Sequence, residues 1–452
     1  MKKLSIGILL SFTATMATAQ AASNRFHPNH LFIKMKEGHS LVKSPLIKSA
    51  KRIIGRLYLV KTSKPEALAL ELAASEEIEY TQKDFFGEKI KMPKLEVLDQ
   101  AGLMLKSFTE FDMTSFNDPE FSKLWAFNST AGMNVSEAYD SLPNKTAQEI
   151  IVAVVDTGVD HNHDDLKDIM WTNEKEIAGN GIDDDNNGYI DDIHGINTLV
   201  RDAQGRATMN TMASHWHGTH VSGTIAASQN NGIGITGVAS NVKIMAIRTV
   251  PDDADELDSN IVEAYKYAAQ NGARLINCSF GKSNNEGGMV VRDVINEIGK
   301  KYNTLVIASA GNDSMGPYTW HDNDTSPKYP ASFDSENLLV VASTTSTAGL
   351  SSFSNIGKNT VDIAAPGSNI YSTLNGNKYG MASGTSMASP NTTGVAAMVL
   401  GYNSTLTAVQ LKDLMMKSVT KVSAFGGKIV SGGRVNLKSA LSKSARKSLI
   451  RK

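Results

Sequence analysis

Short apolar runs that stop at small or polar residues form the clearest pattern along most of the chain. Ile151–Val155 ends at Asp156, and Leu305–Ala308 ends at Ser309. Unbroken apolar runs of this length predict strands buried on both faces, as in a parallel sheet covered by helices. The segment Gly394–Leu400 is also apolar but rich in small residues, which predicts a buried helix. We therefore expect an α/β domain with a mainly parallel sheet.

A different pattern precedes this domain, between about residues 29 and 91. Leu31–Met35 and Arg56–Lys61 alternate apolar and polar residues as half-buried strands do. Pro65–Ala73 has proline at its start and reads as a helix, and Ile78–Thr81 reads as another strand. The resulting β-β-α-β order predicts a separate small α+β domain.

The first residues have the features of a secretory signal. Lys2 and Lys3 precede an apolar stretch that begins at Leu4, and Ala17–Ala19 offers a small-x-small cleavage site. We assign residues 1–21 to this signal and expect a secreted or periplasmic protein. An uncleaved anchor is the alternative, but the stretch is short and rich in threonine and serine for a membrane span. We therefore expect no stable membrane association.

Composition narrows the range of partners. The chain has 452 residues, enough for one large and one smaller domain. It carries 45 Lys and Arg against 46 Asp and Glu, so its charge gives no reason to expect nucleic acid as a partner. Its one cysteine, Cys278, lies in the mostly apolar run Leu275–Phe280 and excludes an intramolecular disulfide. We read it as a small buried hydrophobe rather than a reactive thiol.

The chain carries three residues of the types used in nucleophilic catalysis, in the order Asp156, His217 and Ser386. Asp156 ends an apolar run, at the strand end where α/β sheets place their sites. His217 opens a small-residue helix. Ser386 stands just before the apolar helix, and Pro390 should fall in the first turn, where a missing N–H costs little. Ser386 is then at a helix N-terminus, which favours developing negative charge.

Four motifs carry a family resemblance. VVDTGVD at 154–160, HGTHVSGT at 217–224, SAGN at 309–312 and GTSMASP at 384–390 together resemble the subtilisin-like serine proteases, or subtilases. An aspartate at a strand end, a lone histidine or a Gly-Thr-Ser turn each has an ordinary structural reading. Their joint occurrence in this order favours catalysis. The resemblance covers roughly the last three quarters of the chain and implies a three-layer α/β/α subtilisin-like domain.

The resemblance assigns roles to individual residues. Ser386 is the nucleophile, His217 the general base, and Asp156 the group that orients and stabilises the imidazole. Asn312 and the backbone N–H of Ser386 stabilise the oxyanion. Polypeptides are the expected substrates.

Substrate-binding residues follow from the same resemblance. Ser279, Phe280 and Gly281 correspond to the strand that pairs with substrate backbone, and Asp313 to an acidic position at the specificity pocket. Acidic residues at 252–258 could favour basic substrates by complementarity. We favour the simpler reading that they precede a helix at Asn260–Asn271 and stabilise its N-terminus.

The densest acidic cluster of the chain lies at Gly179–Asp192. Alternate oxygen-bearing residues followed by Gly188 match the first half of an EF-hand loop, but His194 stands where the bidentate glutamate would be. Hard oxygen ligands at this density favour Ca²⁺, with a solvated acidic turn as the alternative. The candidate ligands are Asp183, Asp185, Asn187, Asp191 and Asp192.

A second calcium loop is suggested by the resemblance alone. Gln229–Ile235 together with Asp165 is similar to the usual subtilase site. Leu124 occupies the position at which relatives supply a glutamine ligand, and this departure weakens the expectation.

The domain boundaries complete the prediction. Residues 22–115 resemble an inhibitory propeptide with a weakly patterned linker, 92–115, that is cut on maturation. An unrelated N-terminal binding domain is the alternative. Residues 116–445 form the peptidase domain, and 446–452 a basic tail. We expect a monomer whose own propeptide is its intramolecular inhibitor.

The prediction is thus a secreted, autoprocessed serine endopeptidase. Two rivals are a catalytically silent relative that binds peptides and an esterase or amidase with the same triad. Two departures from the family pattern affect specificity rather than catalysis. Trp216 precedes His217 where a small residue is usual, and Asn391–Gly394 replaces the common His-Val-Ala-Gly.

Overall fold

The computed structural model describes residues 25–87, 95–96, 116–128, 130–142, 146–252, 256–283, 285, 288–316 and 318–450. The expected signal (1–21) and most of the expected linker (92–115) lie outside these residues. The side chains of the expected basic tail (446–452) lie outside them as well, although its first five residues continue the last helix.

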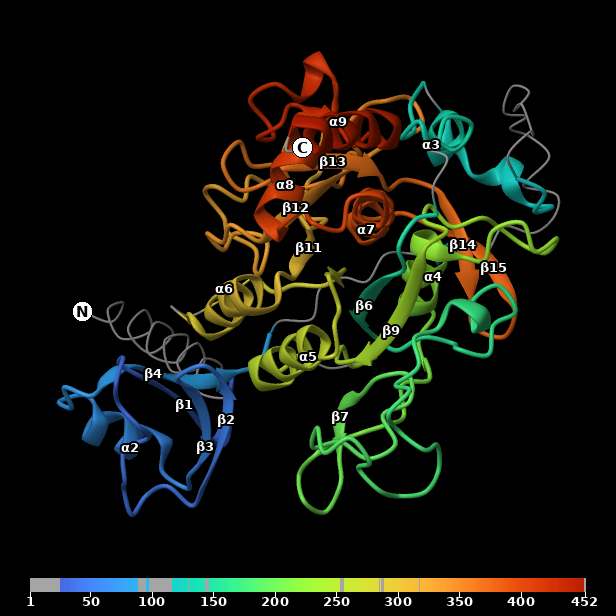
Figure 1. Cartoon of the computed structure of the whole chain (residues 1–452). Coiled ribbons are helices and arrows are strands. Elements are labelled where there is room, and N and C mark those ends of the chain that lie inside the picture. The colour runs from blue at the N-terminus through green and yellow to red at the C-terminus, as the bar shows by residue number, and fades with distance from the viewer. Residues whose placement is uncertain are drawn as a thin grey trace, which may run out of the picture.

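A small four-stranded antiparallel sheet forms the N-terminal part (blue in Figure 1). Its core is Leu31, Ile33, Met35 and Val60, closed on one face by a short helix. The sheet has the order β2-β3-β1-β4. The elements are β1 (Phe26–Met35), β2 (Ser49–Ile54), β3 (Leu57–Lys61), α2 (Pro65–Leu72) and β4 (Ile78–Phe85). Three strands and the helix were expected, and β2 is the addition.

A ten-stranded sheet is the centre of the large domain, with order β16-β17-β13-β12-β11-β10-β6-β9-β7-β8. Eight neighbouring strands are parallel, and an antiparallel strand closes each edge. The parallel strands are β6 (Ile150–Asp156), β7 (Asn197–Arg201), β9 (Val242–Arg248), β10 (Leu275–Cys278), β11 (Leu305–Ser309), β12 (Leu338–Thr344), β13 (Ile363–Pro366) and β17 (Gly433–Arg434). The edge strands are β8 (Ala207–Thr208) and β16 (Thr420–Lys421).

Helices cover both faces of this sheet, because alternate residues of each buried strand point to opposite sides. Val152 and Val154 of β6 pack in one apolar core, while Ala153 and Val155 pack in the other. The first core includes α4 (His217–Ala226), α7 (Thr385–Tyr402), α8 (Ala408–Lys417) and α9 (Leu437–Ile450). The second includes α5 (Asp258–Gln270) and α6 (Val290–Tyr302). The expected three-layer α/β/α fold is confirmed.

A three-stranded antiparallel sheet lies at one end of the large domain (Figure 1). It brings two sequence-distant segments together, since Leu95 pairs with Ala382 and Glu96 with Met381. Its strands are β5 (Leu95–Glu96), β14 (Ile370–Leu374) and β15 (Lys378–Ala382). Short helices are η2 (Phe121–Lys123), η3 (Trp125–Phe127), α3 (Val135–Tyr139), η4 (Lys167–Ile169) and η5 (Ser423–Phe425).

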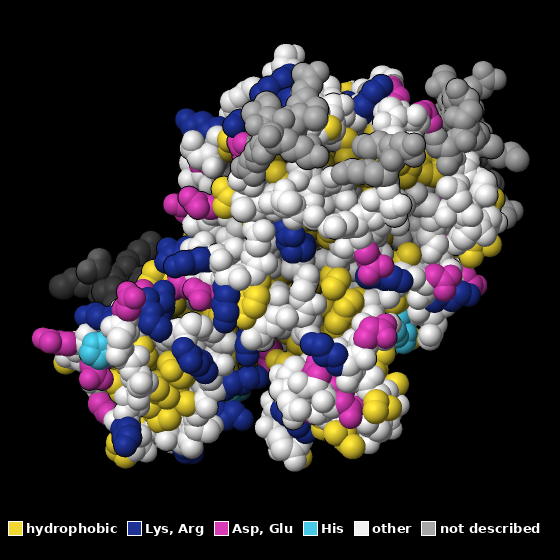
Figure 2. Space-filling model, viewed as in Figure 1, with side chains coloured by type: hydrophobic (Ala, Val, Ile, Leu, Met, Phe, Trp, Pro, Cys, Tyr) yellow, Lys and Arg dark blue, Asp and Glu magenta, His cyan; other side chains and the backbone are white. Residues whose placement is uncertain are grey.

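The small sheet packs against α5 and α6, and side chains of the two parts interlock. Phe32 and Leu57 of the small sheet belong to the core that contains α5 and α6. Lys34 Nζ lies 2.6 Å from Asp293 Oδ2 on α6, and Lys51 Nζ lies 2.6 Å from Glu263 Oε1 on α5. A groove remains between the small sheet and the β7 region, visible between the two lower lobes in Figure 2.

Candidate active site

Asp156 and His217 meet at the carboxyl edge of the sheet. Asp156 is the last residue of β6 and His217 the first of α4, and both side chains are almost fully buried. His217 Nδ1 lies 2.8 Å from Asp156 Oδ1 and 3.0 Å from Oδ2. The close approach needs glycine, because a Cβ on Gly218 would lie 2.1 Å from the carbonyl oxygen of Gly158. These contacts fix the imidazole with Nε2 directed away from Asp156.

Ser386 is the second residue of α7, on the other side of the cleft. Its Oγ donates to the carbonyl oxygen of Ser279 at 3.0 Å. Among the residues that the structure describes, His217 Nε2 has no hydrogen-bond partner although it is buried. The Ser386 hydroxyl therefore hydrogen-bonds to the segment after β10, and His217 Nε2 keeps a free lone pair or proton.

Pro390 does not lie where we expected it. It is the sixth residue of α7 rather than part of the first turn, so it leaves the carbonyl of Ser386 without its i+4 donor. The hydroxyl of Ser279 donates to that carbonyl at 3.0 Å and satisfies it. Because of the proline, the Ser386 carbonyl is bound by the segment after β10 instead of by its own helix.

Asn312 follows β11 and faces the start of α7. Its Oδ1 accepts hydrogen bonds from the backbone N–H of Thr385 at 2.8 Å and from Thr385 Oγ1 at 3.0 Å. A backbone N–H requires an acceptor, so this contact fixes the orientation of the amide. The Asn312 Nδ2 group is then left to donate elsewhere, next to the first turn of α7.

Asp313 is held by two partners. Asn355, which is fully buried, donates from Nδ2 to Asp313 Oδ2 at 3.0 Å, and Lys328 Nζ lies 3.1 Å from Asp313 Oδ1. Burial alone would raise the pKa of Asp313, but the hydrogen bonds from Asn355 and Lys328 and the Lys328 charge hold that pKa below its usual value. Asp313 is therefore ionised, and the ammonium of Lys328 balances its negative charge.

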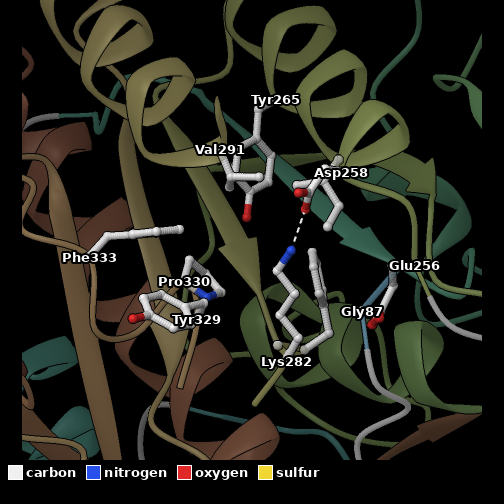
Figure 3. Close-up of a pocket in the computed structure, with 12 residues that line it drawn as sticks. Gly87, Glu256, Asp258, Tyr265, Lys282, Val291, Tyr329, Pro330 and Phe333 are labelled. Carbon is white, nitrogen blue, oxygen red and sulfur yellow. Dashed lines mark hydrogen bonds and ion pairs between the residues drawn. The ribbon is translucent and has the colours of Figure 1, made fainter. Parts of the chain in front are cut away.

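A small, mainly apolar pocket adjoins Phe280 and Gly281 (Figure 3). Lys282 crosses it, and its Nζ lies 2.6 Å from Asp258 Oδ1 at the start of α5. Asp258 is almost fully buried, in agreement with the helix-terminal reading of this acidic residue. The walls are formed by Ile261, Tyr265, Phe280, Val291, Pro330 and Phe333.

The N-terminal domain reaches this pocket. Gly87 lines it, and the N–H of Gly87 donates to the carbonyl oxygen of Glu256 at 2.7 Å. Phe86 forms an antiparallel bridge with Leu257. Upstream, Gln82 Oε1 accepts from the N–H of Val290 at 3.0 Å, and Asp84 Oδ1 from that of Ser259 at 2.9 Å. The two residues after β4 thus pair with the residues just before α5, and two side chains of β4 cap α6 and α5.

Trp216, which stands before His217 where a small residue is usual, packs edge-on against two rings. Its ring centroid lies 5.5 Å from that of His217 and 5.8 Å from that of His220. Burial, with the adjacent His217 as a smaller cause, lowers the pKa of His220 to about 3. His220 Nε2 is 3.0 Å from the carbonyl oxygen of Ile370, so His220 is a neutral structural residue beneath the site.

The acidic loop brings part of the expected metal set together. Carboxylate oxygens of Asp183, Asp185 and Glu176 all lie within 4.8 Å of one another, and this is the only such group found among the described residues. An all-oxygen set of three carboxylates fits a hard cation such as Ca²⁺. Sequence reasoning missed Glu176, because it lies before the EF-hand-like pattern begins at Gly179.

The other two expected carboxylate ligands, Asp191 and Asp192, are not part of this group of three. Asp191 accepts from three backbone N–H groups, those of Gly179, Asn180 and Gly181. Asp192 accepts from Asn187 Nδ2 at 2.9 Å and from the hydroxyl of Tyr267, and Asn187 Oδ1 accepts from the N–H of Tyr189. These hydrogen bonds shape the loop around the carboxylate group, and the N–H of Asn187 donates to both Asp183 Oδ1 and Asp185 Oδ1 at 3.0 Å.

Asp165 lies apart from this loop and does not fit a metal. Its carboxylate accepts from Asn231 Nδ2 at 2.8 Å, the N–H of Ile235 at 2.9 Å and the hydroxyl of Tyr379 at 2.9 Å. The space is filled, because a Cβ on Gly234 would lie 2.0 Å from the Tyr379 hydroxyl oxygen. Leu124 is buried and brings no donor atom. We therefore do not retain the second calcium loop.

The fold and this arrangement are those of the subtilisin-like class. The family model for the subtilase family matches residues 147–433, and the chain belongs to that family. Subtilisin-like protease 1 of Plasmodium berghei (strain Anka) is 32% identical over 348 residues, which are 74% of this chain and 56% of that protein. The Extracellular basic protease of Dichelobacter nodosus is 30% identical over 381 residues, which are 75% and 60% of the two chains.

A solved structure extends the likeness to the fold. A protease from Pseudoalteromonas arctica PAMC 21717 is 26% identical, with a TM-score of 0.59, and the match covers 73% of this chain and 100% of that one. The chain spans about half to three fifths of the length of the curated relatives named above. No helix in the described part of the chain is both long and apolar enough to cross a membrane.

Proposed function

We propose that the chain is a serine endopeptidase that cleaves polypeptides through an acyl-enzyme. The observation that carries this proposal is the Asp156–His217 contact at 2.8 Å, with Ser386 at the start of α7 and the oriented Asn312 amide beside it. The relatives described above are named as proteases, which supports a proteolytic activity. The strand after β10 supports peptides over other acyl substrates, because it offers backbone groups for extended pairing.

The mechanism assigns one step to each group. Ser386 Oγ turns from the Ser279 carbonyl, transfers its proton to His217 Nε2 and attacks the substrate carbonyl carbon. Asp156 holds Nδ1–H and stabilises the imidazolium that forms. Asn312 Nδ2 and the Ser386 N–H donate to the tetrahedral oxyanion, which the N-terminus of α7 also favours. His217 then returns the proton to the leaving amine, and water completes hydrolysis by the same route.

We further propose that residues 22–115 act as propeptide and inhibitor, and that the protein is a secreted zymogen. Gly87 pairs with Glu256 beside the substrate strand, and Leu95 pairs with Ala382, four residues before Ser386. A chain that pairs on this path blocks access of other peptides to Ser386. The relatives named as extracellular proteases, from Dichelobacter nodosus and Xanthomonas campestris, support secretion.

Calcium is the proposed structural cofactor of the acidic loop. Glu176, Asp183 and Asp185 would hold it, and the ion would offset the mutual repulsion of three carboxylates. The ion stabilises the loop and takes no part in the reaction. Nearby, Tyr189 of the same loop donates to Glu263 on α5 at 2.9 Å, so an ordered loop also supports the helix under the propeptide.

The test is expression of the chain beside its Ser386→Ala variant in calcium, followed by intact mass and casein hydrolysis. The parent is expected to shed an N-terminal segment and digest casein, while the variant stays full-length and inert. We expect the new N-terminus to lie within the linker 92–115, which the sequence assigns to the cleaved part of the propeptide. If both proteins are folded, full-length and inert even after limited trypsin treatment, the peptidase proposal is wrong.

A further inference from the structure

One carboxylate of α5 connects the acidic loop to the N-terminal domain. Glu263 is almost fully buried, and its two oxygens take different partners. Oε1 accepts from the hydroxyl of Tyr189 at 2.9 Å and from Lys51 Nζ at 2.6 Å, while Oε2 accepts from Arg201. Tyr189 belongs to the acidic loop, Lys51 to β2 and Arg201 to β7. A single oxygen atom therefore binds both the loop and the N-terminal domain.

The charge of Glu263 is balanced without the N-terminal domain. Arg201 Nη1 pairs with Glu263 Oε2, and Arg201 Nη2 donates to Asn260 Oδ1 at 2.7 Å. Lys51 is a second cation on the same carboxylate, and its side chain is half-exposed. When Lys51 leaves, Glu263 still has Arg201 and is not left as a buried, unpaired charge, which would be costly. The Lys51 contact is therefore suited to docking that can be reversed.

Tyr189 also lies next to the docking lysine itself. Lys51 Nζ is 5.9 Å from the centroid of the Tyr189 ring, within the range of a cation–π interaction. The Tyr189 ring is buried and packs edge-on against Tyr267 of α5, with ring centroids 5.1 Å apart. Tyr189 thus contacts both members of the Lys51–Glu263 pair from a fixed position.

The conformation of the loop determines where Tyr189 lies. The N–H of Tyr189 donates to Asn187 Oδ1 at 2.9 Å. The N–H of Asn187 donates to Asp183 Oδ1 and Asp185 Oδ1, at 3.0 Å each. These two carboxylates belong to the group that we propose to hold calcium. A short series of hydrogen bonds therefore connects the proposed calcium ligands to Glu263.

We propose that Tyr189 is a docking residue for the N-terminal domain, through which the acidic loop controls how firmly that domain is held. The inference rests on the proposed propeptide role of the domain. An ordered loop presents Tyr189 and Glu263 Oε1 to Lys51 in one geometry, so less conformational freedom is lost when β2 docks. Coupling of this kind is reciprocal, so the docked domain also stabilises the loop. A cation that orders the loop should therefore slow release of the propeptide.

The test measures hydrogen exchange by mass spectrometry in the full-length Ser386→Ala chain, with and without calcium. The N–H groups of Met289 and Val290 report undocking, because both donate to Gln82 Oε1 of β4 and lose this acceptor when the domain leaves. Both N–H groups lie at the start of α6, away from the substituted residues.

Two substitutions should speed this exchange. Lys51→Met is expected to raise the rate about threefold to fivefold, the size of a partly exposed charge pair. Tyr189→Phe keeps the packed ring, removes only the hydroxyl and should raise the rate about twofold. Calcium should lower the rate in the Ser386→Ala chain, and Tyr189→Phe should remove most of this effect.

Two further variants separate coupling from structural damage. Lys51→Met/Tyr189→Phe should exchange no faster than Lys51→Met alone if Tyr189 acts through Lys51, whereas additive effects would mean that Tyr189 serves only the structure of the loop. Tyr379→Phe is the matched control, because the Tyr379 hydroxyl also donates to a carboxylate at 2.9 Å, that of Asp165, outside the loop and the N-terminal domain. It should leave the exchange of Met289 and Val290 unchanged.

An unchanged rate in Tyr189→Phe would overturn the inference. Protection of the loop amides by calcium without any effect at Met289 and Val290 would overturn it as well. The Ser386→Ala chain is not expected to cleave itself, so this result does not depend on proteolysis. Shedding of the N-terminal segment by the Ser386 parent tests the propeptide proposal separately, and the two proposals can therefore fail independently.

Discussion

Ser386 and Ser279 exchange two hydrogen bonds across the cleft, each 3.0 Å long. The hydroxyl of Ser386 donates to the carbonyl of Ser279, and the hydroxyl of Ser279 donates to the carbonyl of Ser386. The second bond exists because Pro390 supplies no N–H to the Ser386 carbonyl. The first turn of α7 is thus tied to the segment after β10. In the proposed mechanism this bond holds the nucleophile at a fixed position relative to the strand that pairs with the substrate backbone.

Replacing Ser279 with alanine should therefore impair catalysis more than binding. The Ser386 carbonyl would lose its donor while buried, which costs about 1–3 kcal/mol, and the first turn of α7 would shift. We expect kcat to fall about tenfold with little change in KM, and Ser279→Thr to retain most of the activity because it keeps the hydroxyl. Thr392→Ala, which removes a buried hydroxyl farther along α7, is the control. An unchanged kcat in Ser279→Ala would contradict this reading.

Replacing Asn312 should affect only the transition state. Asn312→Ala removes the oriented Nδ2 donor. We expect kcat to fall about 100- to 1000-fold with KM nearly constant, as on removal of one oxyanion donor from subtilisin. Asn312→Asp tests orientation, because it keeps the acceptor for Thr385 but replaces the donor with a negative charge. Steady-state kinetics on one peptide decide the matter, and a fall in kcat/KM that comes from KM would count against the oxyanion role.

The buried His220 should make the fold less stable in acid. Its pKa is about 3 in the folded state because of burial and His217, against an ordinary value near 6.5 in the unfolded chain. Between these pH values the unfolded chain binds a proton that the folded chain does not, so stability falls by roughly 1.4 kcal/mol per pH unit as pH decreases. Urea unfolding of Ser386→Ala, which cannot digest itself, should show a steeper loss from pH 6.5 to 4 than Ser386→Ala/His220→Gln. Equal slopes would rule out the neutral buried imidazole.

The acidic loop should respond to calcium through specific carboxylates. Calcium is expected to raise the melting temperature of Ser386→Ala, and Asp185→Asn should remove most of that rise. In a chelator the variant that also carries Asp185→Asn should have a higher melting temperature than Ser386→Ala alone. The reason is that Asp185→Asn relieves repulsion within the group formed with Glu176 and Asp183. Asp184→Asn is the matched control, since Asp184 accepts from Asn180 Nδ2 instead of joining the group. An equal calcium response of both variants would refute the assignment.

The Asp165 region should, by contrast, be indifferent to calcium. Tyr379→Phe removes one of three donors to the Asp165 carboxylate and should lower the free energy of unfolding by about 1–3 kcal/mol. The loss is expected to be the same in calcium and in a chelator, measured by urea unfolding in the Ser386→Ala background. A loss that calcium abolishes would restore a metal to this loop.

The parts of the fold with regular patterns could be predicted from the sequence. The apolar runs at β6 and β11 predicted strands buried on both faces. The small-residue motifs predicted that Asp156 ends a strand, that His217 begins a helix and that Asn312 follows a strand. Helix α7 starts at Thr385, more than two turns before the apolar run that begins at Gly394, because Thr385–Pro390 is buried without being strongly apolar. The position of Pro390 was missed for that reason.

Long-range contacts between charged residues could not be predicted. Nothing near Asp313 in the sequence marks Lys328 as its partner, and Glu176 stands outside the acidic pattern that it completes. Asp165 was assigned to a metal from the family resemblance alone, and its donors Tyr379 and Ile235 could not be recognised in the sequence. Such contacts depend on how the sheets and loops come together in space.

The labelling rate of the single thiol, Cys278, can measure how often strand β10 opens beneath the site. Cys278 ends β10, immediately before Ser279, and is fully buried, and burial raises its pKa to about 12. A thiol reagent can modify it only when β10 separates from its neighbours and the thiolate forms. The labelling rate of the unaltered chain therefore reports how often the floor of the cleft opens, and labelling before and after propeptide removal would show whether the bound propeptide slows that opening.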